Sequence, residues 1–171
     1  MTPAPRQLKR TAYHEAGHAV AAVLMDVPFR RVTILPDAQC AGRVDLANVE
    51  PPIHVKAARD HWARRICVFL AGPLAETLYS RCWQQQPISN EHTDEFKVWE
   101  IIACFDLRAK ADRVNRLRFQ MLERLRAPDV WAVVEVVALE LLKRKTLNST
   151  QVHSLVQRVR PCGMRTKARN R

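Results

Sequence analysis

Helical spacing of apolar residues is the feature that most constrains the fold of this 171-residue chain. Apolar residues recur every three or four positions over long stretches, and that period places them along one face of an α-helix. Glycine, which tight hairpins favour, occurs only four times. The spacing predicts helices over residues 7–26, 54–79, 92–105, 107–126, 128–145 and 148–160.

Two short segments favour β-structure. "FRRVTILP" and "AGRVDLANV" contain β-branched residues and lie between turn-forming residues. Gly72 and Pro73 fall inside the second expected helix, which they should bend or split. Ser149 or Thr150 should cap the last helix. The predicted fold class is α+β, predominantly α-helical, with one small sheet of two strands.

Composition and length predict a soluble domain. Hydrophobic residues make up 47% and charged residues 26% of the chain, a balance typical of globular proteins. No uninterrupted apolar run approaches the roughly 20 residues of a membrane span, and the N-terminus lacks the apolar segment of a secretory signal. The five cysteines are scattered and form no CxxC pair, so reduced thiols and a cytoplasmic location are expected.

The net charge of +11 is concentrated at the C-terminal end. Glu140 is the last acidic residue, and nine lysines and arginines follow it. We expect one domain over residues 1–160 and a basic, disordered tail over 161–171. Such a tail could contact nucleic acid or an acidic surface, or be a dispensable solvated end, and no aromatic residue lies within it to stack on bases.

The segment "YHEAGHAVAAVL", residues 13–24, carries the chemistry. His14 and His18 lie one helical turn apart on one face, so their ring nitrogens can converge on one metal ion at about 2.0–2.1 Å. Glu15 lies beside that face, where its carboxylate can take a proton from a water on the metal. The same HExxH pattern also occurs by chance on purely structural helices, so the pattern alone leaves both interpretations open.

A catalytic zinc needs a third protein ligand and an open position. The extended metzincin motif would place a histidine at position 24, which is Leu24 here. The residues themselves leave several candidates open: Asp45, Glu50, Glu76, Glu91, Asp94, His61 and His92.

Four segments together resemble one known family. They are "YHEAGHAV", "RRVTILPDAQCAGRV", "FLAGPLAETLYS" and "SNEHTDEFKVWEIIA". In motif, order and spacing they are similar to the peptidase domain of FtsH-type ATP-dependent zinc metalloproteases, from about Thr11 to Leu155. The resemblance implies Zn²⁺ as cofactor and Asp94, at the start of a later helix, as the third ligand.

The resemblance also implies roles for the remaining site residues. His14 and His18 are expected to be metal ligands and Glu15 the general base. Independently of the resemblance, Glu76 lies on a helix expected to pack near the site, where it is expected to orient a ligand histidine or to form a structural ion pair, with direct ligation as the alternative. The chain departs from the family at Pro73, Leu74 and Thr77, where Gly, Arg and Glu are typical, and it has no Walker A motif.

The expected function is a zinc-dependent endopeptidase that cleaves unfolded or flexible protein segments. It is expected to be a free-standing domain without the AAA+ ATPase module, ATP-independent in itself and able to work with a separate ATPase or adaptor. "RRVTILP" either offers an exposed edge to an extended peptide or is an ordinary core strand. The alternative function is a catalytically weak or inactive zinc-binding scaffold that contacts nucleic acid or an acidic partner through its basic C-terminus.

Overall fold

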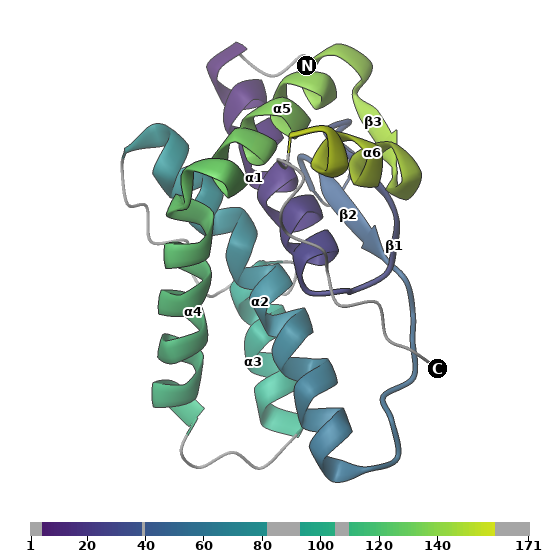
Figure 1. Cartoon of the computed structure of the whole chain (residues 1–171), viewed down its shortest axis with the longest axis vertical. Coiled ribbons are helices and arrows are strands. Elements are labelled where there is room, and N and C mark those ends of the chain that lie inside the picture. The colour runs from purple at the N-terminus through teal and green to yellow at the C-terminus, as the bar shows by residue number, and fades with distance from the viewer. Residues whose placement is uncertain (1–4, 39, 82–92, 105–109, 160–171) are drawn as a thin grey trace.

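The computed structural model describes residues 5–38, 40–81, 93–104 and 110–159. Within these ranges the fold consists of six helices and one small antiparallel sheet at one side of the molecule (Figure 1), which confirms the predicted α+β, predominantly helical class. The helices are α1 Pro5–Leu24, α2 Val55–Ser80, α3 Asp94–Cys104, α4 Lys110–Arg126, α5 Pro128–Arg144 and α6 Ser149–Val159. The strands are β1 Phe29–Thr33, β2 Arg43–Leu46 and β3 Thr146–Asn148.

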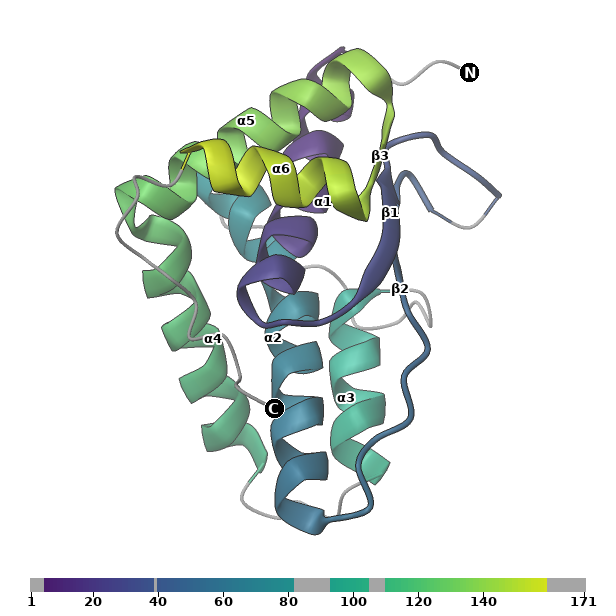
Figure 2. The ribbon, with the colours of Figure 1, turned by 45° about the vertical axis from the view of Figure 1, so that its right-hand side comes forward.

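Helix α1 lies at the centre of the fold, against α2, α5 and the sheet (Figure 2). Its buried face consists largely of alanines, which allow neighbouring backbones to approach closely. At Gly17 the approach is closest, because an added Cβ would lie 2.5 Å from Ala75 Cβ and 2.6 Å from the Ala71 carbonyl oxygen. No side chain at position 17 separates the two helices, so residues of α1 and α2 can line the same site.

Helix α2 runs unbroken from Val55 to Ser80, so the expectation that Gly72 and Pro73 split it is wrong. Pro73 lacks the N–H that would bond to the carbonyl four residues earlier, but a helix packed on several sides tolerates one missing bond. Helices α1, α3 and α4 all contact α2. Packing on these neighbours stabilises the segment more than local propensity disfavours it.

The sheet has three strands in the order β2-β1-β3, not the expected two. In the antiparallel β1–β3 pair, Val32 lies opposite Leu147 and Thr33 opposite Thr146. Strand β3 has only three residues and pairs with a strand more than 100 positions earlier, so no local pattern reveals it. Strand β1 is consequently central, so of the two alternatives for "RRVTILP" the ordinary core strand is correct and the exposed edge is not.

The cap of α6 also differs from the prediction. The Gln151 backbone N–H donates to Asn148 Oδ1 at 2.9 Å, and the Asn148 N–H donates to Gln151 Oε1 at 2.9 Å. This reciprocal capping box begins one residue before the predicted Ser149 or Thr150 cap.

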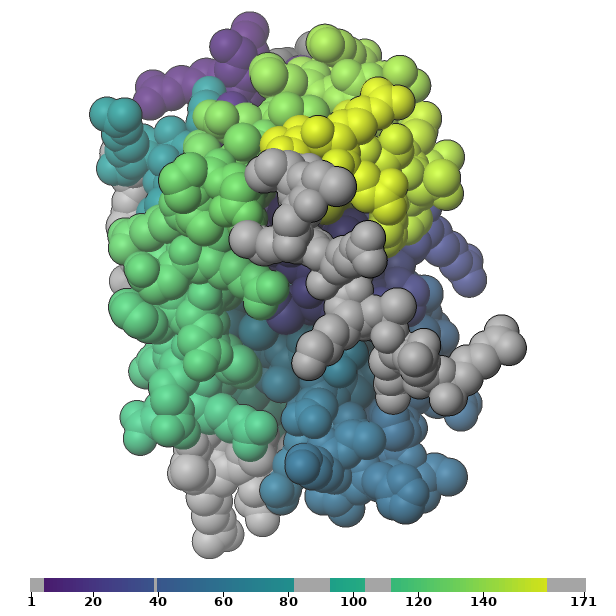
Figure 3. Space-filling view, viewed as in Figure 1, coloured from purple at the N-terminus to yellow at the C-terminus, as the bar shows by residue number. Residues whose placement is uncertain are grey.

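Helices α4, α5 and α6 form much of the surface seen in the space-filling view (Figure 3). No helix in the described part of the chain is both long enough and apolar enough to cross a bilayer. Among the described cysteines, Cys40 and Cys67 are free thiols. Cys82, Cys162 and the predicted basic tail at 161–171 lie outside the described residues.

Candidate metal centre

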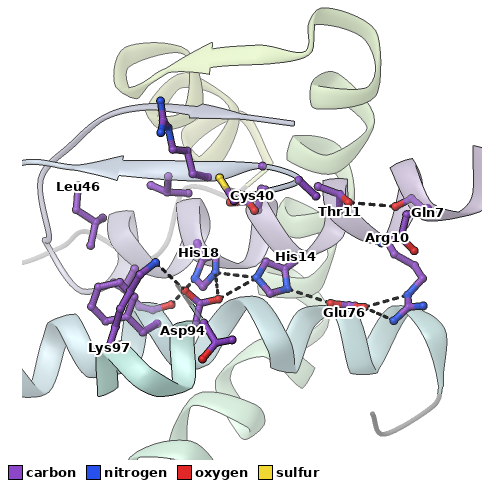
Figure 4. Close-up of a pocket in the computed structure, with 18 residues that line it drawn as sticks. Gln7, Arg10, Thr11, His14, His18, Cys40, Leu46, Glu76, Asp94 and Lys97 are labelled. Carbon is purple, nitrogen blue, oxygen red and sulfur yellow. Dashed lines mark hydrogen bonds and ion pairs between the residues drawn. The ribbon is translucent and has the colours of Figure 1, made fainter. Parts of the chain in front are cut away.

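Three donor atoms from two helices meet at one point, as Figure 4 shows. Asp94 Oδ2 lies 3.0 Å from Nε2 of His14 and 3.0 Å from Nε2 of His18, and the two Nε2 atoms lie 3.1 Å apart. Donor atoms of a tetrahedral site with bonds of about 2.0–2.1 Å lie about 3.3 Å apart. Two imidazoles and one carboxylate at this separation fit a zinc ion.

The outer hydrogen bonds of both imidazoles decide which nitrogens face the cluster. His14 Nδ1 lies 3.0 Å from Glu76 Oε2, and His18 Nδ1 lies 2.7 Å from the Val68 carbonyl oxygen. A carboxylate and a carbonyl only accept, so each Nδ1 carries a proton and donates it. The two Nε2 lone pairs then face each other and Asp94 Oδ2, an arrangement that needs a shared cation.

Asp94 is free to face the histidines because a neighbouring residue caps its helix. Thr93 Oγ1 accepts the backbone N–H of Phe96 at 3.2 Å, and the Thr93 carbonyl accepts that of Lys97 at 3.2 Å. Thr93 thus serves as the N-cap of α3. The carboxylate of Asp94 therefore lies against the two imidazoles.

The electrostatics of the cluster are those of a cation site. Burial opposes protonation of His14, but hydrogen bonds to Asp94 and Glu76 outweigh it and raise its pKa to about 10. Burial also opposes ionisation of Asp94, yet the adjacent His18 and His14 hold its pKa well below the usual range. Without a metal the cluster therefore retains a proton, which a metal must displace.

Glu15 is buried beside the histidines, with 4% of its surface exposed. Its Oε2 atom has no hydrogen-bond partner within the described residues. Burial raises the pKa of Glu15, and the charges of His14 and His18 oppose that rise. A buried carboxyl oxygen without a partner is costly in a fold, so its position next to a cation site indicates a role for the carboxylate there.

Gly42, just before β2, makes room for that carboxylate. A Cβ added at this position would lie 3.0 Å from Glu15 Oε1 and 2.8 Å from the Thr33 carbonyl oxygen. Any side chain here would press on Glu15 or on β1. The residue thus brings the start of β2 into contact with the site.

Glu76 lies on the far side of His14 from the donor cluster, where it contacts the histidine's Nδ1. Arg10 donates to its other oxygen, Oε1, from Nε at 2.9 Å and from a terminal nitrogen. Burial would raise the pKa of Glu76, but His14 and Arg10 lower it overall. In this geometry Glu76 orients His14 and is not one of the three converging donors.

A pocket of about 530 Å³ opens over the cluster. Strand β2 and the residues before it line one side, including Cys40, Gly42, Val44 and Leu46. Lys97 lines it from α3, with its ammonium 3.5 Å from Asp94 Oδ1 and 5.4 Å from the Phe69 ring centre. His14, His18, Asp94 and Glu15 all line this pocket.

The other candidate ligands lie elsewhere. Asp45 pairs with Arg31 at 2.6 Å, and His61 packs edge-on against Trp62. Neither lines the pocket, and neither does Glu50. Glu91 and His92 lie outside the described residues.

Sequence reasoning did not identify four residues that shape the site: Arg10, Gly42, Gly72 and Lys97. Two signals were available for them. Arg10 lies one helical turn before His14, and Gly72 is a glycine inside a helix. The position of Gly72 matters because an added Cβ would lie 2.2 Å from His18 Nε2.

Comparison with known proteins relates the first half of the chain to one family. Residues 1–85 match the model of peptidase family M41. A stretch of 75 residues is 35% identical to the ATP-dependent zinc metalloprotease FtsH of Magnetococcus marinus. The chain therefore contains an FtsH-type peptidase domain, and its match to family M41 covers residues 1–85.

The match to that M41 relative is partial. It covers 43% of this chain and 11% of the relative's length. The family-model match includes His14, Glu15, His18 and Glu76 but ends before Asp94. The position of Asp94 in the cluster thus rests on the structure alone.

Proposed function

We propose that the chain is a zinc-dependent endopeptidase that cleaves unfolded or flexible protein segments. The observation that carries the proposal is the convergence of His14 Nε2, His18 Nε2 and Asp94 Oδ2 within 3.0–3.1 Å of one another. The match of residues 1–85 to a peptidase family supports it, and so does the buried carboxyl of Glu15 beside the cluster.

The three residues would hold zinc through two nitrogens and one oxygen, and Glu76 and Val68 fix the orientation of the imidazoles. When bound, zinc supplies Lewis-acid chemistry that polarises carbonyl groups and makes water acidic near neutral pH. Glu15 is the general base: its Oε2 accepts a proton from the attacking water. The same carboxyl then donates that proton to the leaving amine nitrogen as the peptide bond breaks.

A raised pKa suits Glu15 to this exchange. A carboxylate with an ordinary pKa holds a proton too weakly to return it efficiently near neutral pH. Burial raises the pKa of Glu15, which strengthens the carboxylate as a base. The water and the leaving nitrogen both reach it through the pocket.

Strand β2 supplies the surface along which a substrate would lie. Within the described residues β2 pairs only with β1, so its outer edge is open to an extended peptide. Arg43, Val44 and Leu46 of this strand line the pocket. An extended segment suits this edge, which is why we propose unfolded or flexible substrates, delivered directly or by a separate ATPase or adaptor.

Glu15→Gln tests the proposal. The variant should retain zinc, because Glu15 is not among the converging donors, and should lose about 10²- to 10⁴-fold in hydrolysis of fluorescently labelled casein. Glu100→Gln, an exposed glutamate on α3 outside the pocket, is the matched control and should match the wild type.

Full activity of Glu15→Gln would remove the mechanism. A wild-type protein with stoichiometric zinc and no hydrolysis of casein or other denatured proteins would instead support the zinc-binding scaffold.

A further inference from the structure

We propose that Arg10 is a positioning residue that sets the metal affinity of the cluster through Glu76 and His14. This proposal rests on the proposed function in one respect: the cluster must hold a metal. It concerns residues that contact neither the metal nor the substrate.

The three side chains form a continuous hydrogen-bonded chain. Arg10 donates to Glu76 Oε1 at 2.9 Å through Nε, with a second donation from a terminal nitrogen, and His14 Nδ1 lies 3.0 Å from Glu76 Oε2. Arg10 and His14 are four residues apart on α1, so both project toward the same turn of α2. Glu76 thus bridges two consecutive turns of α1 (Figure 4).

An arginine in this place fixes the carboxylate more firmly than a point charge would. Its fork of donors engages Oε1 from two nitrogens, which leaves Oε2 directed at His14. The side chains of Arg10, Glu76 and His14 are 24%, 16% and 15% exposed, so solvent screens these contacts only in part.

The consequence for the cluster is a fixed tautomer and a fixed ring plane. With Glu76 accepting from Nδ1, the lone pair of His14 stays on Nε2, which faces His18 and Asp94. Without Arg10 the carboxylate of Glu76 gains freedom to rotate, and the imidazole loses its firm support. Metal affinity should fall even though every converging donor remains.

Zinc affinity, measured by competition with a chromophoric chelator, tests the inference without any peptidase assay. Substitution of a ligand's outer hydrogen-bond partner typically costs about 10–100-fold in affinity, so Glu76→Gln should lose that much and Arg10→Met, one contact further out, about 3–10-fold. Arg10→Lys should restore part of the loss. Arg6→Met removes an exposed arginine one turn earlier on α1 and should bind zinc as the wild type does.

A double substitution separates this role from a general effect on charge or folding. If Arg10 acts through Glu76, Arg10→Met should have no further effect in the Glu76→Gln background. The absorption bands of the Co²⁺-loaded protein should shift in Arg10→Met, since they report ligand geometry. If Arg10→Met impairs folding, Arg10→Lys and the Co²⁺ bands of the folded fraction give the same comparison.

The outcomes distinguish this inference from the proposed function. Unchanged zinc affinity in Arg10→Met, or additive losses in the double variant, would overturn the role of Arg10 and leave the peptidase intact. A wild type that binds zinc but hydrolyses nothing would remove the peptidase and leave this inference standing. A wild type that binds no zinc would overturn both.

Discussion

Gly72→Ala tests the position of His18 more directly than any change to the histidine itself. A Cβ at position 72 would lie 2.2 Å from Nε2, 2.4 Å from Cε1 and 2.7 Å from Cδ2 of the imidazole. Ordinary van der Waals contact begins at 3.4 Å. The ring must therefore retreat by about 1 Å, several times the ±0.2 Å tolerance of a metal–ligand bond.

Zinc affinity should consequently fall by more than about 100-fold, because substitutions outside the ligand shell already cost about 10–100-fold. The metal-free fold should survive. Alanine is favoured over glycine in a helix by about 1 kcal/mol, which offsets part of the cost of displacing the ring. A fall in zinc affinity with unchanged helix content would identify this clash.

Zinc competition and circular dichroism of the metal-free protein measure the two quantities separately. Gly17→Ala is the contrasting variant, because its Cβ would meet Ala75 and the Ala71 backbone at 2.5 and 2.6 Å. It should lower the melting temperature of the metal-free protein through the α1–α2 contact. If Gly72→Ala bound zinc as the wild type does, His18 would not hold the metal in the position described.

Two further predictions concern carboxylates. Asp94→Ala should lower the zinc affinity by more than about 100-fold, so metal analysis of the purified variant should find little zinc, whereas Asp45→Ala should retain it. Stoichiometric zinc in the Asp94 variant would exclude Asp94 as a ligand. Glu15→Gln should raise the melting temperature of the metal-free protein at pH 7.5 but not at pH 4. Burial raises the pKa of Glu15 in the folded protein above its ordinary 4.5. As pH rises from 4.5 through the folded-state pKa, ionisation of the buried carboxyl destabilises the fold, whereas at pH 4 the carboxyl is mostly neutral and has little such effect. An equal rise at both pH values would contradict this explanation.

Local periodicity was enough to predict most of the helices. The 7–26 and 128–145 predictions lie within two residues of α1 and α5, because each segment has an apolar face and a nearby proline. The spacing of His14 and His18 likewise follows from helix geometry alone. A pattern that recurs every few residues is visible within a short stretch of sequence.

Features that depend on distant partners could not be predicted. Strand β3 exists because Leu147 pairs with Val32, and Pro73 stays helical because neighbouring helices pack around α2. Position 72 requires glycine because the imidazole of His18, 54 positions earlier in the chain, occupies the space where a Cβ would lie. Each of these depends on a contact between segments whose separation in sequence carries no periodic signal.

The site residues nevertheless follow a simple pattern once it is known which residues of α1 and α2 contact one another. Arg10, His14 and His18 form one i, i+4, i+8 stripe on α1, and Val68, Gly72 and Glu76 form another on α2. Arg10 and His14 contact Glu76, whereas His18 contacts Val68 and abuts Gly72, so the two stripes run antiparallel.

This register explains why the small residues between the helices matter for chemistry as well as for packing. Gly17 sets the separation at which α1 and α2 meet, and that separation allows the Val68 carbonyl and the Glu76 carboxylate to reach the two Nδ1 atoms. Two helices thereby fix both imidazoles before any metal arrives. Only Asp94 comes from a third element, α3, so the contact between α2 and α3 is where the cluster is completed.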